Sequence, residues 1–130
     1  MSSPPAARPG ALRIVICDYN ALLHSVTGLL RMSGYYVFQA YNGEAAEELC
    51  SDLHGIGLLV LNTEGTGVDT PALVRSIRKT HPGLPVLHIG TAPIPGMPSN
   101  VQHLPESFTA AQLLQTVSGL VPGPQVVPQP

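Results

Sequence analysis

The sequence predicts a single α/β domain built on a parallel sheet. Three observations carry this prediction: short apolar runs alternate with segments of helical periodicity, Gly, Asn and Pro separate these segments, and 44% of the residues are hydrophobic. Strands that alternate with helices favour right-handed crossovers and a parallel sheet covered on both faces. A chain of 130 residues is long enough to bury one such core without disulfides or metal.

The first half of the chain predicts two strand–helix pairs. Residues 12–17 form a short, largely β-branched run that is typical of a strand buried on both faces. Residues 21–33 follow with helical spacing, and Gly34 suits the end of that helix. Residues 36–40 then predict a second strand and residues 44–53 a second helix. The apolar residues at helical spacing are Leu22, Val26, Leu29 and Leu30 in the first helix, and Ala45, Leu49 and Leu53 in the second.

The second half repeats this alternation. Residues 58–61 predict a third buried strand, and the helix after it is expected to use Thr70 as its capping residue with Pro71 in the first helical position. Thr109 is expected to cap the last helix in the same way. The remaining strands are residues 85–89 and 101–104, and the last helix is residues 109–120.

Composition limits the domain boundaries and the classes of function. We expect a flexible N-terminal tail over residues 1–11, the domain over residues 12–121, and a proline-rich C-terminal tail over residues 122–130. The formal charge of -2 provides no basic field for nucleic acid. No apolar run approaches the length of a membrane span, and no secretory signal is evident, so we expect a cytoplasmic protein.

Cysteine and histidine usage gives no sign of a cofactor. Cys17 and Cys50 could bridge in principle, but buried free thiols are expected for a reducing compartment. The histidines lack the paired helical spacing or Cys/His clustering of zinc sites, so we predict no metal or other cofactor. They are His24, His54, His81, His88 and His103.

Candidate functional residues lie just beyond the predicted strands. In open parallel sheets, the loops at the carboxyl ends of the strands converge to form the site. After the first and third strands, the chain has Asp18, Tyr19, Asn62 and Glu64. After the fourth and fifth strands it has Gly90, Thr91 and Glu106.

The order of several short segments resembles the receiver domain of two-component response regulators. These segments are residues 14–18, 29–35, 40–46, 59–62, 66–69, 84–87 and 108–111. Their specificity comes from the order and spacing of many weak matches. The resemblance implies a flavodoxin-like (CheY-like) doubly wound fold with five parallel strands in the order 2-1-3-4-5.

The same resemblance implies a phosphorylation site that this chain has altered. In the family, two acidic residues and an acceptor aspartate bind Mg²⁺, a hydroxyl residue follows the fourth strand, and a lysine follows the fifth. Asp18 keeps the first acidic position, whereas Tyr19 replaces the second and Asn62 replaces the acceptor. Gly90, with Thr91 beside it, falls at the hydroxyl position. Glu106 reverses the charge of the lysine and would repel an anion.

These changes predict a degenerate receiver that is not phosphorylated and is not an enzyme. An amide is not the anionic nucleophile that forms an acyl phosphate. We interpret Asn62 as a cap of its loop, Asp18 as an acceptor for backbone groups at the start of the first helix, and Tyr19 as a ring over the vacated pocket. Two alternatives stay open: a small ligand or cation in the altered acidic pocket, or a hydrolase using Asp18, Glu64 and Glu106.

The function is therefore sought at a surface that binds a protein partner. Residues 91–99 contain three prolines where the family has its fourth helix, so we predict a shortened helix or an extended loop. The candidate output face comprises Ile94, Met97, Val101 and His103, the last at the family's aromatic reporter position. The expected partner is a histidine kinase, another regulator or a second copy of the chain.

Overall fold

The fold is described for residues 12–121 of a computed structural model, so the predicted tails, 1–11 and 122–130, lie outside the described residues. The strands are β1 (Arg13–Asp18), β2 (Tyr36–Ala40), β3 (Ile56–Asn62), β4 (Val86–Gly90) and β5 (Val101–Pro105). The helices are α1 (His24–Met32), α2 (Gly43–Asp52), α3 (Thr70–Ile77) and α4 (Ala110–Leu120). α4 spans 11 residues, and no helix within residues 12–121 combines the length and apolar character of a membrane span.

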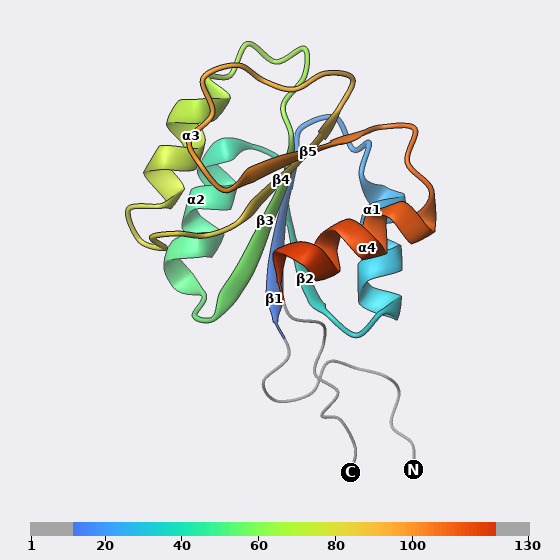
Figure 1. The fold of residues 1–130 in the computed structure, drawn as a ribbon. Coiled ribbons are helices and arrows are strands. Elements are labelled where there is room, and N and C mark those ends of the chain that lie inside the picture. Colours follow the sequence, from blue (N-terminus) through green and yellow to red (C-terminus); the bar gives the residue numbers. More distant parts are fainter. Residues whose placement is uncertain (1–11, 122–130) are drawn as a thin grey trace.

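The five strands form one parallel sheet in the order β2-β1-β3-β4-β5. The α2 and α3 helices lie on one face, and α1 and α4 lie on the other (Figure 1). This arrangement confirms the predicted flavodoxin-like fold and its strand order. The reversal of strand order at β1 places the loops after β1 and β3 next to each other, which is where such sheets build their sites.

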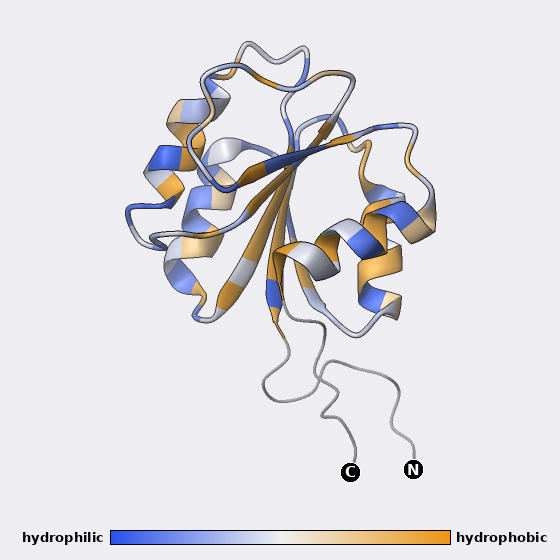
Figure 2. Ribbon diagram, viewed as in Figure 1, coloured by the Kyte–Doolittle hydropathy of each residue, from blue (hydrophilic) through white to orange (hydrophobic). Residues whose placement is uncertain are grey.

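Alternation along each central strand fills two separate cores. In β1, Ile14 and Ile16 join the core beneath α1 and α4, whereas Val15 and Cys17 join the core beneath α2 and α3. Figure 2 shows the resulting run of hydrophobic residues along the central strands. Each fully buried aliphatic side chain contributes about 1.5–3 kcal/mol, so the two-sided burial of the sheet accounts for its continuous apolar sequence.

Two helices begin at positions that differ from the prediction. The first helix starts at His24 rather than at residue 21, because Ala21 adopts a left-handed backbone with φ of 55°. In α3 the capping residue is Asp69, whose side chain accepts from the Ala72 amide at 3.1 Å. The predicted cap at Thr70 is wrong because this hydroxyl is hydrogen-bonded to Thr63 instead.

The last helix begins as predicted. The Thr109 side chain accepts from the Gln112 amide at 3.1 Å, and the Gln112 side chain accepts from the Thr109 amide at 2.8 Å. This reciprocal capping box satisfies two of the amide groups that lack partners at the start of a helix.

The proline-rich segment between β4 and β5 contains turns and bends in place of a helix, which confirms the predicted loss of the family's fourth helix. Arg78, just after α3, holds the end of this segment. Its guanidinium donates to the carbonyl oxygens of Ser99 at 2.7 Å and Asn100 at 3.0 Å, and to that of Leu84 at 2.6 and 2.9 Å. Hydrogen bonds from a charged donor thus replace helical bonding as the support for this region.

Both cysteines are buried and free, as predicted. Burial, with a smaller contribution from the neighbouring Asp18 charge, raises the pKa of the Cys17 thiol to about 12. Burial also raises the pKa of Cys50 to about 11. Because the thiolate is the reactive form, both residues serve as apolar core side chains.

Candidate functional site

The candidate residues gather at the carboxyl edge of the sheet. Asp18 ends β1 and lies beside Asn62, which ends β3. Gly90 ends β4, and Glu106 directly follows β5. Glu64 lies in the loop after β3. The topology thus brings together residues that are separated by up to 88 positions in the sequence.

The Asp18 carboxylate is fully buried and serves the backbone. One oxygen accepts from the amide of Leu22 at 2.9 Å, and the other accepts from the amide of Leu23 at 2.8 Å. These bonds stabilise the turn that leads into α1 and offset the cost of burying the charge. The structure therefore agrees with the interpretation of Asp18 as an acceptor for backbone groups.

The Asn62 amide uses both of its functional ends. Its Nδ2 donates to the carbonyl oxygen of Ile89 at 2.7 Å, and its Oδ1 accepts from the Glu64 amide at 3.2 Å. The second bond is the predicted Asx-type cap. The first bond ties β3 to β4 and requires a donor, which an ionised aspartate lacks. With an exposed fraction of 1%, the side chain has no access to bulk water that could replace this donor.

The Glu64 carboxylate occupies the space above the end of β4. Its Oε2 accepts from the Thr91 amide at 2.7 Å and from the Thr91 hydroxyl at 2.8 Å. These two bonds lower the pKa of Glu64, the bond from the hydroxyl having the larger effect. A Cβ at Gly90 would lie 2.7 Å from the same oxygen, so glycine leaves room for the carboxylate. The Thr91 hydroxyl is consequently bound by the chain's own anion.

The Tyr19 side chain reaches the start of α2. Its hydroxyl accepts from the Gly43 amide at the start of α2 at 2.6 Å, and its ring packs against the core beneath α2 and α3. A Cβ at Gly43 would lie 2.8 Å from the hydroxyl oxygen, so this contact needs glycine. A backbone donor on α2 thus holds the hydroxyl, and Tyr19 is not among the residues that line the cavity beside Asn62, so its role as a ring over the vacated pocket stays a prediction.

A cavity of about 250 Å³ lies between the ends of β3 and β4 and the loop after β5. Asn62 and Ile89 line it together with Glu106 and Phe108. Glu106 is exposed, and Phe108 is half-buried against the core beneath α1 and α4. The cavity has a neutral amide and an apolar wall opposite a carboxylate, so its electrostatics disfavour an anion.

A histidine pair lies on the other face of the sheet. The Nδ1 atoms of His88 and His103 are 3.1 Å apart, and the two rings stack with centroids 5.2 Å apart. Burial lowers the pKa of His88, the positive charge of His103 lowers it further, and the charge of Glu64 acts in the opposite direction. The sequence reasoning singled out His103 but missed His88. Both residues are third in their strands, and this shared position is the sequence signal that would have paired them.

The predicted output face has a structural role in part. Met97 and Val101 are half-buried and pack against the core beneath α2 and α3, and Ile94 is half-buried in the proline-rich loop. Met97 and Val101 thus help to cover the sheet where the family has its fourth helix. Partner binding at this face stays a prediction.

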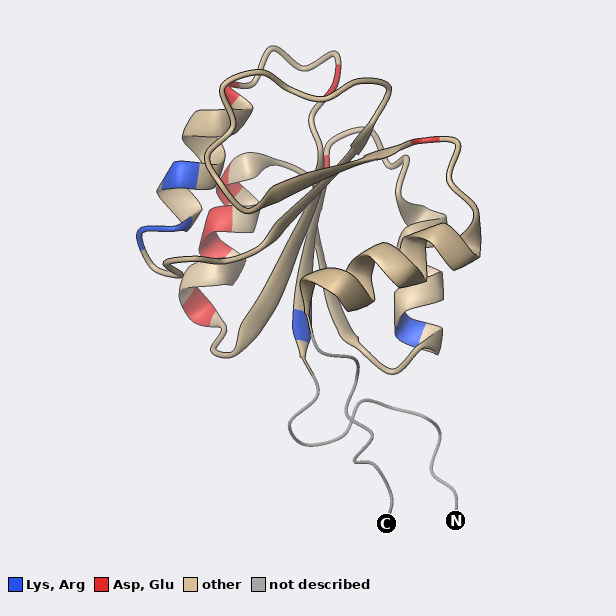
Figure 3. Cartoon of the chain, viewed as in Figure 1, with Lys and Arg blue, Asp and Glu red and all other residues tan. Residues whose placement is uncertain are grey.

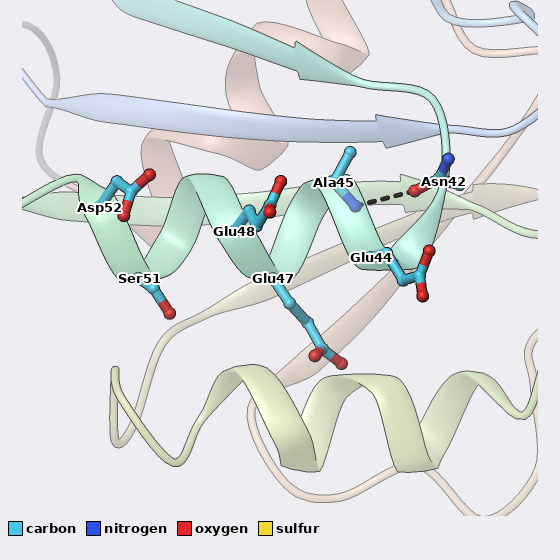
Figure 4. Close-up of a pocket in the computed structure, with 7 residues that line it drawn as sticks. All are labelled: Asn42, Glu44, Ala45, Glu47, Glu48, Ser51 and Asp52. Atoms are coloured by element: carbon cyan, nitrogen blue, oxygen red, sulfur yellow. Dashed lines mark hydrogen bonds between the residues drawn. The ribbon is translucent and has the colours of Figure 1, made fainter.

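Acidic side chains also gather on α2. Figure 4 shows Glu44, Glu47, Glu48 and Asp52 along this helix, with Glu47 directed toward α3. The Asn42 side chain caps the helix by accepting from the Ala45 amide at 2.7 Å. Within residues 12–121, no group of three or more His, Cys, Asp or Glu side chains is placed to hold a metal ion.

Comparisons with known proteins identify the class of domain. No family model matches the chain. It is 27% identical over 115 residues to the sensor kinase CckA of Brucella abortus; this match covers 83% of the chain and 12% of the kinase. The chain therefore spans only a small part of that relative's length.

Solved structures agree with this match. The receiver domain of the hybrid histidine kinase CckA is 27% identical, with a TM-score of 0.71 and coverage of 83% of this chain and 97% of that one. A response regulator receiver protein from Sinorhizobium medicae is 28% identical, with a TM-score of 0.72 and coverage of 85% and 94%. The chemotaxis protein CheY4 of Vibrio cholerae, at 17% identity, shares the fold with a TM-score of 0.74 and coverage of 85% and 99%.

The chain thus has the fold of a response-regulator receiver domain. It is similar in sequence and structure to the receiver domain of a hybrid histidine kinase and to a response regulator receiver protein, both of which belong to two-component signalling.

Proposed function

We propose that this receiver domain is not phosphorylated and acts as a protein-interaction module in two-component signalling. The observation that carries the proposal is the bond from Asn62 Nδ2 to the Ile89 carbonyl oxygen. The fold uses the amide as a hydrogen-bond donor at the position where the family has its acceptor aspartate. The substitution is therefore integrated into the packing between β3 and β4 and does more than remove a nucleophile.

The surrounding contacts support the same proposal. Both oxygens of Asp18 accept backbone bonds, so binding a cation would compete with the turn into α1. The Glu64 carboxylate accepts bonds from the amide and hydroxyl of Thr91, which lies beside the position where the family has its hydroxyl residue. At Glu106 a carboxylate stands where a cation would be needed to neutralise phosphate.

The two alternatives receive less support from this geometry. A cation in the altered pocket needs oxygen ligands that are free to coordinate, whereas Asp18 and Glu64 are engaged by backbone and hydroxyl donors. A hydrolase would need a base that is positioned against a nucleophile. Asp18 is fully buried, and Glu106 is an exposed residue, so neither is arranged as such a pair.

Treatment with acetyl phosphate and Mg²⁺, followed by intact mass measurement, tests the absence of phosphorylation. The expected product is the unmodified chain. Any phosphoryl adduct on this chain, whether stable or labile, would refute the proposal. A phosphorylatable receiver domain treated in the same tube provides the positive control, because its adduct shows that the phosphodonor was active.

The class of partner follows from the class of domain. The candidates are a histidine kinase, another regulator, and a second copy of this chain. Sedimentation of the purified chain at several concentrations tests self-association: a mass that stays at that of the monomer excludes the second copy.

A further inference from the structure

The cavity beside Asn62 has apolar walls and opens at the carboxyl edge of the sheet. Leu22, Leu23, Ile89 and Phe108 form these walls. Leu22 keeps 57% of its surface exposed although its amide is fixed by Asp18, so an apolar side chain is held at the rim of the cavity. A concave site with mostly apolar walls and a few polar groups is typical of a binding site.

Among the described residues, the side chains that line this cavity include one carboxylate and no cation. Glu106 lines the cavity and is exposed, whereas the Asn62 amide is neutral and already hydrogen-bonded. The four arginines within residues 12–121 donate to backbone carbonyl oxygens elsewhere in the fold; they are Arg13, Arg31, Arg75 and Arg78. In Figure 3 the basic residues are coloured along β1, α1, α3 and the segment after α3, whereas the loop after β5 carries an acidic residue.

The size of the cavity selects between two kinds of occupant. Pockets for drug-sized molecules have volumes of about 300–1,000 Å³. A cavity of about 250 Å³ lies below that range and suits a single long side chain. Arginine and lysine combine an apolar stem with a cationic head, which matches apolar walls that lead to a carboxylate.

We propose that this cavity receives an arginine or lysine side chain presented by a protein partner. The stem lies against Leu22 and Ile89, and the cationic head pairs with Glu106. Arginine fits better than lysine, because its planar guanidinium binds a carboxylate with two parallel bonds and stacks on an aromatic ring such as Phe108. The inference rests on the proposed function, since it names the partner chemistry of an unphosphorylated receiver.

A titration followed by amide NMR tests the proposal on the full chain. The probe is Nα-acetyl-arginine methylamide, which presents an arginine side chain between two peptide groups. The expected result is a saturable shift of the signals of Leu22, Glu106 and Phe108. Glu106→Gln should weaken the affinity about tenfold or more, and Leu22→Ser should weaken it several-fold. Both residues are exposed, so we expect each variant to fold, and its amide spectrum checks this.

Two controls separate this site from general attraction to acidic surfaces. The corresponding citrulline compound has the same shape without the charge and should produce no saturable shift. Glu48→Gln removes an exposed carboxylate from α2 and should leave the affinity unchanged. Equal binding of citrulline, an unchanged affinity in Glu106→Gln, or shifts confined to α2 would overturn the proposal.

A further arm distinguishes a protein partner from a small molecule. Ethylguanidinium carries the same cation without peptide groups and should bind more weakly than the arginine compound. Tighter binding of ethylguanidinium would overturn the assignment to a protein partner, because peptide groups would then hinder entry. A phosphoryl adduct with acetyl phosphate would refute the proposed function through a different readout, so the two failures are distinguishable.

Discussion

Replacing Asn62 by aspartate tests the central contact of this site. At pH 7.5 the variant loses the donor to the Ile89 carbonyl oxygen and places a charged oxygen beside it, in a side chain that is 1% exposed. The lost bond and the unsatisfied carbonyl together cost about 2–4 kcal/mol. Because folded domains are stable by about 5–15 kcal/mol, urea unfolding will resolve this change readily.

The pH dependence of this loss identifies its cause. Burial next to a carbonyl oxygen raises the pKa of the introduced carboxyl group above its unfolded value of about 3.9. The folded state then binds more protons, so the variant regains stability as pH falls, since a protonated carboxyl group donates to Ile89. The difference between wild type and Asn62→Asp should therefore shrink from pH 7.5 to pH 5.

Asn42→Asp provides a matched control for the same chemical change. The Asn42 side chain is exposed and only accepts a bond, from the Ala45 amide, and aspartate caps helices as well as asparagine does. This control should stay within about 0.5 kcal/mol of wild type. Equal stabilities of Asn62→Asp and wild type at pH 7.5 would refute the reasoning from the Ile89 bond.

Three further perturbations test other contacts. Arg78→Ala should lower the free energy of unfolding by about 2–3 kcal/mol, because three carbonyl groups lose a charged donor. Arg75→Ala removes one exposed contact and should stay within about 0.5 kcal/mol of wild type. Equal losses in the two variants would contradict the role of Arg78 in supporting the proline-rich segment. Because the pKa of His88 is lowered in the folded chain, the unfolded chain gains this proton first as pH falls below about 6.5, and the free energy of unfolding declines there. His88→Phe should flatten this decline in urea unfolding between pH 7 and pH 5. An unchanged slope would exclude His88 as the source of the decline. Gly90→Ala should displace Glu64 from Thr91 and return the Glu64 pKa toward its ordinary value in a carboxyl NMR titration; a pKa that stays low would show that the carboxylate keeps its place.

The sequence alone determined the order and kind of the structural elements. Continuous apolar runs marked strands buried on both faces, and Thr109 marked the start of α4, because these signals depend on neighbours a few residues away. The three prolines between β4 and β5 excluded the helix that the family has there, because proline breaks helical bonding locally. The start of α1 was missed because the Asp18 side chain holds the residues before it in a non-helical turn.

Asn62 shows most clearly which contacts the sequence predicts and which only the tertiary structure decides. Its Asx-type bond reaches two residues along the chain and could be predicted from the sequence, whereas its donor bond reaches Ile89, 27 residues away. Two other bonds also join distant segments, one between Glu64 and Thr91 and one between Tyr19 and Gly43, so only the tertiary structure decided them. The sequence placed an amide at the end of β3; the packing of β3 against β4 decided that this amide is a structural donor.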